Sequence, residues 1–224
     1  MTNMLNVYMD DIEVISDETP QSFDKLKKGV FSDDSEIRER SFSKLACFEY
    51  TEEIKNIFNR GLLDSDELIR SDCIEFLAEF DLLDNLEKIC ELLDDPSHYV
   101  VDSCVISLAE LNSKNEKVIK LLINKLKDKQ LKSGTVLSIH YALYKLDPTY
   151  SIGNLLVCYS DSRDYRDRCA ILNLLAEGIR EEDIPVIKEK LDKIVNPNDF
   201  RSVLSKYDEL LAREFNHEVH HSLN

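Results

Sequence analysis

The chain has 224 residues, 43% of them apolar and 32% charged, with only 5 Gly, 5 Pro and no Trp, a composition that favours long helices over a turn-rich sheet fold. Its net charge of −16 repels phosphate backbones and attracts basic proteins, which argues against a nucleic-acid ligand. No apolar run reaches the roughly 20 residues that span a bilayer, and the first residues lack the basic flank and apolar stretch of a signal peptide, so we expect a cytoplasmic protein that does not bind membranes.

The chain begins with an acidic segment. Residues 1–18 carry five acids and no base, and we expect either a short acidic helix or an arm without fixed structure. Thr19 followed by Pro20 is a favourable helix start, and Gly29 is a favourable stop. A first helix is therefore expected between Pro20 and Gly29.

Three segments that follow align with one another without gaps. They are residues 33–46, 65–78 and 96–109, offset by 32 and 31. Each places a β-branched residue, a small residue four positions later and Leu four later again on one helical face. These triplets are Ile37, Ser41 and Leu45; Ile69, Cys73 and Leu77; and Val100, Cys104 and Leu108. We expect the small middle residue to let a neighbouring helix approach closely.

An acidic turn precedes each aligned segment, and its carboxylates are suited to cap the helix that follows. The turns are residues 33–34, 64–66 and 94–97. Apolar residues at spacings of three and four predict companion helices between the turns. These are expected at residues 52–59 and 86–93. Two looser units follow, pairing residues 117–126 with 134–145 and residues 152–159 with 165–176.

This pattern resembles HEAT repeats, in particular the short HEAT-like repeats of the phycobilisome-lyase type. The family motif, a loop Asp followed by Val-Arg, a small residue and Leu, is matched by Asp34…Ile37-Arg38…Ser41…Leu45 and Asp64…Ile69-Arg70…Cys73…Leu77. The resemblance covers about residues 22–178. It implies an all-α fold, an α-solenoid of about five two-helix repeats, in which the Asp and Arg of neighbouring repeats form a ladder.

The later units depart from the motif. The third has Val101 in the Arg position, the fourth has no Asp–Arg pair, and the fifth fits only if Tyr165-Arg166 shifts by one. Beyond them, Asp183, Ile184 and Pro185 open a helix that reaches about Val195, and Asn198 caps another over about residues 199–215. Irregular terminal helices are expected because they cover the open ends of a stacked core.

These readings divide the chain into four parts. We expect an acidic arm or short helix over residues 1–18 and the repeat array over residues 19–180. Capping helices are expected over residues 181–216, and a flexible tail over residues 217–224.

One short string suggests a metal site. His217-Glu218-Val219-His220-His221 matches the zinc-peptidase pattern. Only three residues follow it, so no third ligand lies downstream, and a fraying tail offers no shaped site. The acidic turns at residues 64–67 and 161–164 lack the Gly and the final Glu of a calcium loop. We expect no metal, no cofactor, and six cysteines that are reduced and mostly in the core.

Charge is unevenly distributed along the chain. Residues 32–100 carry 19 acids and 7 bases, whereas residues 114–132 contain seven Lys against Glu116 and Asp128. We interpret the lysine segment as the solvated outer face of a companion helix. The alternative is a contact for an acidic partner or an intramolecular match to the acidic segment.

Stacked helix pairs form an extended concave surface from their second helices. The outward positions of these helices in the aligned units are acidic, with hydroxyl and aromatic groups at the far end, and they would attract and orient a basic partner. The predicted partner-binding residues are Glu39, Ser71, Asp72, Glu75, Asp102, Ile106 and Tyr141. Ser43 and Tyr144 are read as outward-facing too.

The favoured function is protein binding without catalysis. Small acidic proteins with helical repeats are similar to bacterial immunity proteins, which neutralise a toxin domain, often a basic nuclease, and we expect one tight partner and a chain that is monomeric on its own. The alternative is a general adaptor or assembly scaffold with several partners of moderate affinity. A lyase-type HEAT-like enzyme would need a chromophore pocket with a nucleophile or an acid at its floor, and the sequence offers no such cluster.

Overall fold

The computed structural model describes residues 9–16, 18–111 and 114–194, together with Ser205, Asp208 and Ala212. This described part is all-helical, as expected, and contains no strand. None of its helices combines the length and the apolar character needed to traverse a bilayer. The chain divides into two compact units, residues 1–111 (unit 1) and 112–224 (unit 2). Of the helix expected at residues 199–215, the structure describes Ser205, Asp208 and Ala212 alone, each of them helical, and the tail expected at residues 217–224 lies outside the described residues.

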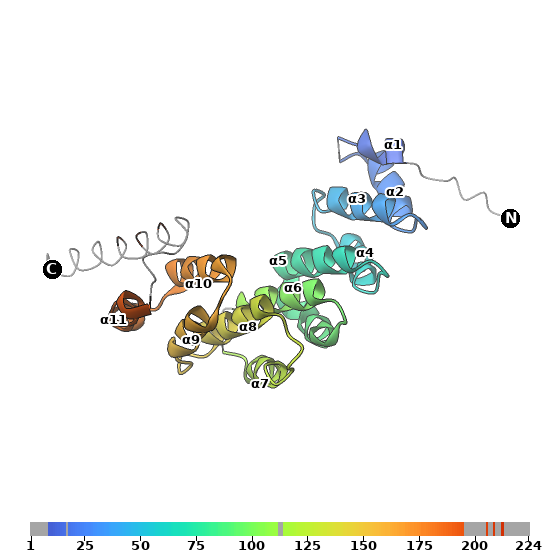
Figure 1. The fold of residues 1–224 in the computed structure, drawn as a ribbon. Coiled ribbons are helices and arrows are strands. Elements are labelled where there is room, and N and C mark those ends of the chain that lie inside the picture. The colour runs from blue at the N-terminus through green and yellow to red at the C-terminus, as the bar shows by residue number, and fades with distance from the viewer. Residues whose placement is uncertain are drawn as a thin grey trace, which may run out of the picture. The chain divides into compact units, whose positions relative to one another are not determined.

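Unit 1 holds the aligned segments and begins with a short acidic helix (Figure 1). Its described helices are α1 (Met9–Glu13), α2 (Pro20–Gly29), α3 (Ser35–Leu45), α4 (Glu52–Gly61), α5 (Glu67–Glu91), the 3₁₀ turn η1 (Leu92–Asp94) and α6 (His98–Ala109). The caps predicted for α2, α3 and α5 are confirmed, since the side chains of Thr19, Asp34 and Asp66 accept hydrogen bonds from backbone N–H groups at the starts of these helices. The turn before α6 differs, because its capping residue Ser97 makes no side-chain capping hydrogen bond.

The companion helix expected at residues 86–93 is present, with its last residues in the 3₁₀ turn η1. It is the second part of α5, which continues across one non-helical residue, Asp81, with φ −157° and ψ 56°. The sequence has no Gly or Pro between residues 79 and 95, so no helix-breaking residue type marks this kinked boundary between two helices. Lys55 of α4 holds this kink, because its Nζ lies 2.7 Å from an oxygen of Asp81 and 2.8 Å from an oxygen of Asp84.

Glycines at the ends of α2 and α4 allow the close helix approach that the small middle residues predict. A Cβ built on Gly29 would lie 2.1 Å from the Ser41 Oγ, and one on Gly61 would lie 2.3 Å from the Cys73 Sγ. Ser41 and Cys73 are the middle residues of the first two aligned segments, and both are fully buried. The small residue and the Gly that faces it therefore form a matched pair in each of the first two aligned segments.

Replacing Gly61 with alanine should destabilise unit 1. The added methyl group overpacks the contact with Cys73, a change that typically costs about 1–3 kcal/mol. Combining it with Cys73→Ala should restore only part of the loss, because the Sγ is then absent but ring atoms of Phe42 remain 2.9 and 3.0 Å from the added methyl group. Chemical denaturation of the three variants measures this. Gly134→Ala is the matched control, since its Cβ would meet nothing within 4 Å and should be neutral or slightly stabilising; an equal loss there would contradict the packing account.

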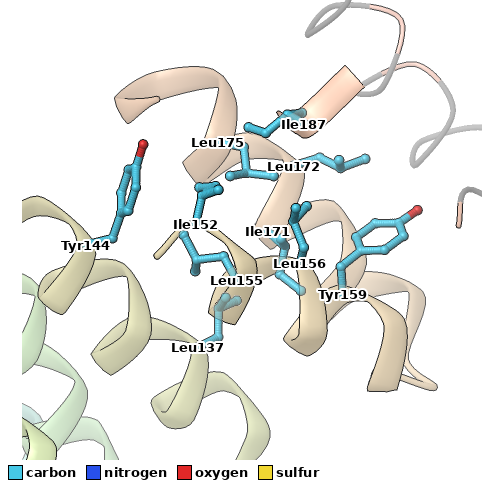
Figure 2. Close-up of a cluster of buried hydrophobic side chains, with 10 residues drawn as sticks. All are labelled: Leu137, Tyr144, Ile152, Leu155, Leu156, Tyr159, Ile171, Leu172, Leu175 and Ile187. Carbon is cyan, nitrogen blue, oxygen red and sulfur yellow. The ribbon is translucent and has the colours of Figure 1, made fainter. Parts of the chain in front are cut away.

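Unit 2 is built around a second apolar core. Its described helices are α7 (Glu116–Lys125), α8 (Ser133–Leu146), α9 (Gly153–Asp161), α10 (Tyr165–Gly178), the 3₁₀ turn η2 (Glu181–Asp183) and α11 (Ile184–Ile194). Figure 2 shows ten side chains of the core, which come from α8, from α9 with its preceding turn, from α10 and from α11. The helix predicted to open near Ile184 and to reach about Val195 is observed within one residue at its described end.

His140 on α8 gives unit 2 a testable pH dependence. Burial lowers the pKa of His140, and its Nδ1 lies 2.6 Å from the hydroxyl oxygen of Tyr150. A histidine with a lowered folded pKa contributes stability above its unfolded pKa of about 6.5, and this is lost as the pH falls through the folded pKa. The unfolding free energy should therefore fall between about pH 7 and pH 5, and it should fall less in His140→Gln. Equal pH slopes in denaturation of the two proteins would refute this.

Candidate protein-binding surface

A bidentate ion pair joins α3 to the turn before α5. The Arg38 Nε and Nη2 each donate to a different oxygen of Asp64, both at 2.8 Å. The Arg38 Nη1 donates to the carbonyl oxygen of Ser32, 3.0 Å away, in the turn before its own helix. Asp64 also accepts from the backbone N–H of Asp66 at 2.9 Å. Burial alone would raise the pKa of Asp64, but the hydrogen bonds outweigh it and the pKa is lowered.

The same arrangement recurs in the next aligned segment of unit 1. The Arg70 Nε and Nη2 donate to the two oxygens of Asp95 at 2.9 and 2.8 Å, and Nη1 donates to the Asp64 carbonyl oxygen at 2.8 Å. Asp95 accepts from the backbone N–H of Ser97 at 2.8 Å. The side chains of Arg70 and Asp95 are only 12% and 7% exposed. The two Asp–Arg pairs therefore fix consecutive helices of unit 1 in the same register.

In the segment expected to form the fifth repeat, the contact of Arg38 is reproduced by a different arginine from the one suggested by the sequence. Asp164 caps α10 by accepting from the backbone N–H of Arg166 at 2.8 Å, and Arg168 follows this cap at the spacing that Arg38 follows Asp34. Its Nη1 donates to the carbonyl oxygen of Ser162 at 3.0 Å, six residues earlier, as the Nη1 of Arg38 does to Ser32. The counterpart of the motif arginine is Arg168, and no shift of Tyr165-Arg166 is needed.

The outward sides of α3, α5 and α6 carry four of the predicted partner-binding residues. We call Glu39, Asp72, Glu75 and Asp102 the acidic ridge. Glu39, Asp72 and Glu75 are exposed, and Asp102 is half-buried. Arg40 is exposed beside Glu39 and offsets part of its charge. The ridge is therefore most strongly negative over α5.

Like charges on the ridge act on one another. The pKa of Asp72 is raised, first by partial burial and then by the negative charges of Glu75, Glu39 and Asp66. A raised folded pKa means that ionised Asp72 is less favourable in the folded chain than in the unfolded one. Asp72→Asn should leave the unfolding free energy unchanged or raise it at neutral pH, as chemical denaturation can measure. A clear loss of stability would show that Asp72 has a structural role.

Ser71 is not part of the exposed surface, contrary to the prediction. It is buried, and its Oγ lies 2.7 Å from the Ser103 Oγ on α6. Ser103 also donates to Glu75 at 2.7 Å. α6 covers this flank of α5, whereas the equivalent Glu39 of α3 is exposed. Together the two hydrogen bonds hold the outward-facing residues of α5 directly beside those of α6.

The predicted aromatic end of the surface lies in unit 2 and is used in packing. Tyr144 is only 2% exposed, not outward-facing. Its hydroxyl donates to Asp183 at 2.7 Å and accepts from the backbone N–H of Arg180 at 2.9 Å, while the Arg180 guanidinium lies 3.9 Å from the ring centroid. Tyr141 is half-buried, and a Cβ built on Gly178 would lie 2.6 Å from its hydroxyl oxygen. We therefore restrict the candidate surface to unit 1.

Sequence reasoning identified Ile106 but missed Leu68 at the start of α5 and Tyr99 at the start of α6, which are also apolar and exposed. Leu68 is 48%, Tyr99 49% and Ile106 55% exposed. We call these three residues the apolar row. Leu68 lies four residues before Asp72, and Tyr99 lies three before Asp102, so each shares a helical face with an acid of the ridge. Leu68 and Tyr99 lie only two residues after the capping residues of α5 and α6. The sequence pattern assigns these positions to the capping turn, so it does not predict that their side chains are exposed on the same face as the acids.

Other expected sites can be compared with the described residues. Within them, no group of three or more His, Cys, Asp or Glu is placed to hold a metal ion, and His217–His221 lies outside them. The cysteines are less buried than expected: Cys73 and Cys104 are buried, Cys47 is exposed, and the other three are of intermediate exposure, namely Cys90, Cys158 and Cys169. In the lysine segment, Lys120 pairs with Glu116 and Lys114 with Asp147, at 3.9 and 3.8 Å.

Comparisons of the chain with known protein families, with characterised proteins and with solved structures gave no match.

Proposed function

We propose that the chain is a protein-binding module without catalytic activity, whose acidic ridge captures a basic protein. The helices would stack as HEAT-like repeats, an arrangement supported in unit 1 by the two equivalent Asp–Arg pairs. A similar pair of contacts joins the companion helices, since Lys27 pairs with Glu53 and Lys55 with Asp81, each 26 residues along the chain. A surface held this firmly loses little conformational freedom when it binds.

The observation that carries the proposal is the placement of the exposed acids Glu39, Asp72 and Glu75 on the outward sides of α3 and α5. The raised pKa of Asp72, caused first by partial burial and then by the neighbouring acids, supports it. The fold itself does not require an acid there, because the equivalent position of α3 is Arg40 and that of α6 is Ser103. Negative charges that repel one another without a structural need are the expected feature of a surface shaped by a cationic partner. Among such partners, we favour a basic, nuclease-type toxin domain that the chain neutralises.

Affinity capture tests this proposal. The wild-type chain and the variant Asp72→Lys/Glu75→Lys are each immobilised and exposed to a lysate of the source cells, at low and at high salt, and retained proteins are identified by mass spectrometry. We expect one basic protein in one-to-one amount on the wild-type chain, and its loss from the variant. Several proteins in lesser amounts would instead indicate the adaptor function. A partner retained equally by both chains would refute the role of the ridge.

A further inference from the structure

The apolar row indicates a property of the partner that the acidic ridge alone does not, namely an apolar group at the interface. Leu68, Tyr99 and Ile106 are large apolar side chains, each about half exposed. Single exposed apolar residues are common on protein surfaces. Three of them on two adjacent helices, close to the acids of the ridge, make this a candidate binding surface, because exposed apolar groups rimmed by polar residues mark interaction sites.

Equivalent positions in α3 show that the fold does not require this row. Counting from the capping residue of each helix, Leu68 and Tyr99 correspond to Glu36, and Ile106 corresponds to Ser43. Glu36 and Ser43 are exposed as well. A helix therefore forms when these positions carry polar residues. Packing within unit 1 does not explain why α5 and α6 carry apolar residues there.

The hydrogen bonds of Ser103 place the row and the ridge on one surface. Ser103 lies between Tyr99 and Ile106 on α6, four residues after the one and three before the other. It donates to Glu75 of α5 at 2.7 Å. The carboxylate of Glu75 is therefore fixed beside the apolar side chains of α6. Asp72 lies one turn from Leu68 on α5.

We infer that the segment the ridge captures is cationic and amphipathic, with an apolar side chain that packs on Leu68, Tyr99 and Ile106 while its cationic side chains pair with Asp72 and Glu75. This inference rests on the proposed function and specifies the chemistry of the partner. Charge complementarity selects a basic segment, and the row selects an apolar group between its charges. Aromatic and aliphatic anchors of this kind supply most of the affinity of an interface, whereas exposed charges supply orientation and association rate.

Two peptides of equal charge test the inference on the full chain. One presents Lys and Leu on one helical face, and in the other Ser replaces each Leu. We expect the Leu peptide to bind about tenfold more tightly, as burial of one or two partly exposed apolar groups implies. Leu68→Ser/Ile106→Ser should remove this difference and leave the affinity of the Ser peptide unchanged. Leu83→Ser is the matched control, because Leu83 is 73% exposed on α5 but lies beyond the kink.

Each contrary result has a definite meaning. Equal affinities of the two peptides, both lost in Asp72→Lys/Glu75→Lys, would overturn the inference and leave the acidic ridge in place. A Leu preference that survives in Leu68→Ser/Ile106→Ser would also overturn it. No binding of either peptide would overturn both proposals. If sedimentation showed that the chain self-associates and that Leu68→Ser/Ile106→Ser is monomeric, the row would be an interface between copies and the inference would be wrong.

Discussion

Replacing Arg70 with alanine is expected to lower the unfolding free energy of unit 1 by about 3 kcal/mol. The substitution leaves the Asp95 carboxylate, which is 7% exposed, without the cation that offsets its burial. It also removes the donor to the Asp64 carbonyl oxygen, so two consecutive turns lose a bond at once. The loss should exceed that of an ordinary surface ion pair, because both side chains are largely removed from water.

Denaturant titration followed by circular dichroism measures this loss. Arg70→Lys should lie between the wild type and Arg70→Ala, because lysine keeps the charge but cannot make the bidentate contact. Lys120→Ala is the control, since Lys120 and Glu116 are 78% and 74% exposed and such pairs contribute at most about 0.5 kcal/mol. Similar losses in Arg70→Ala and Lys120→Ala would contradict the structural role of the Asp–Arg pairs.

The second large effect concerns binding. Asp72→Lys/Glu75→Lys should weaken the complex with a captured basic partner about 100-fold, since each reversal replaces an attraction by a repulsion within the interface. The affinity and association rate of this variant should depend much less on ionic strength than those of the wild type, because the negative charge that attracts the partner is strongest over α5. Titration calorimetry and surface-binding kinetics at two ionic strengths measure both quantities.

The control changes net charge by the same amount elsewhere on unit 1. Glu52 at the start of α4 and Glu91 at the end of α5 are exposed and lie on companion helices rather than on the ridge. Glu52→Lys/Glu91→Lys should reduce affinity only slightly, through the change in total charge. If this variant weakened the complex as much as the ridge variant does, binding would depend on net charge and not on the proposed surface.

Much of unit 1 was predictable because its helices repeat a spacing. The offsets of 32 and 31 fixed the helices, and the small residues Ser41 and Cys73 predicted a close approach that Gly29 and Gly61 complete. The Asp–Arg pairs followed from the resemblance to a repeat family. What could not be predicted is how the two helices within α5 join: no Gly or Pro marks the kink at Asp81, where Lys55 of α4 contacts both Asp81 and Asp84.

Side-chain exposure was predicted less well than the helices. Ser71 and Glu39 hold the same position in the alignment, yet α6 covers Ser71, and its exposure depends on a neighbour that the helical period does not reveal. Tyr144 was expected to face outward as a continuation of the outward positions in the aligned segments. Its hydroxyl instead bonds Asp183, 39 residues later, a long-range contact that no local spacing indicates.

The location of the partner on the acidic ridge can be measured by zero-length cross-linking, in which a carbodiimide joins carboxylates of this chain to lysines of the captured protein. Mass spectrometry of the linked peptides should find Glu39, Asp72 and Glu75 joined to the partner. Links confined to acids of the companion helices, such as Glu52 and Glu91, would contradict the account, because the partner would then bind a face that the ridge does not share.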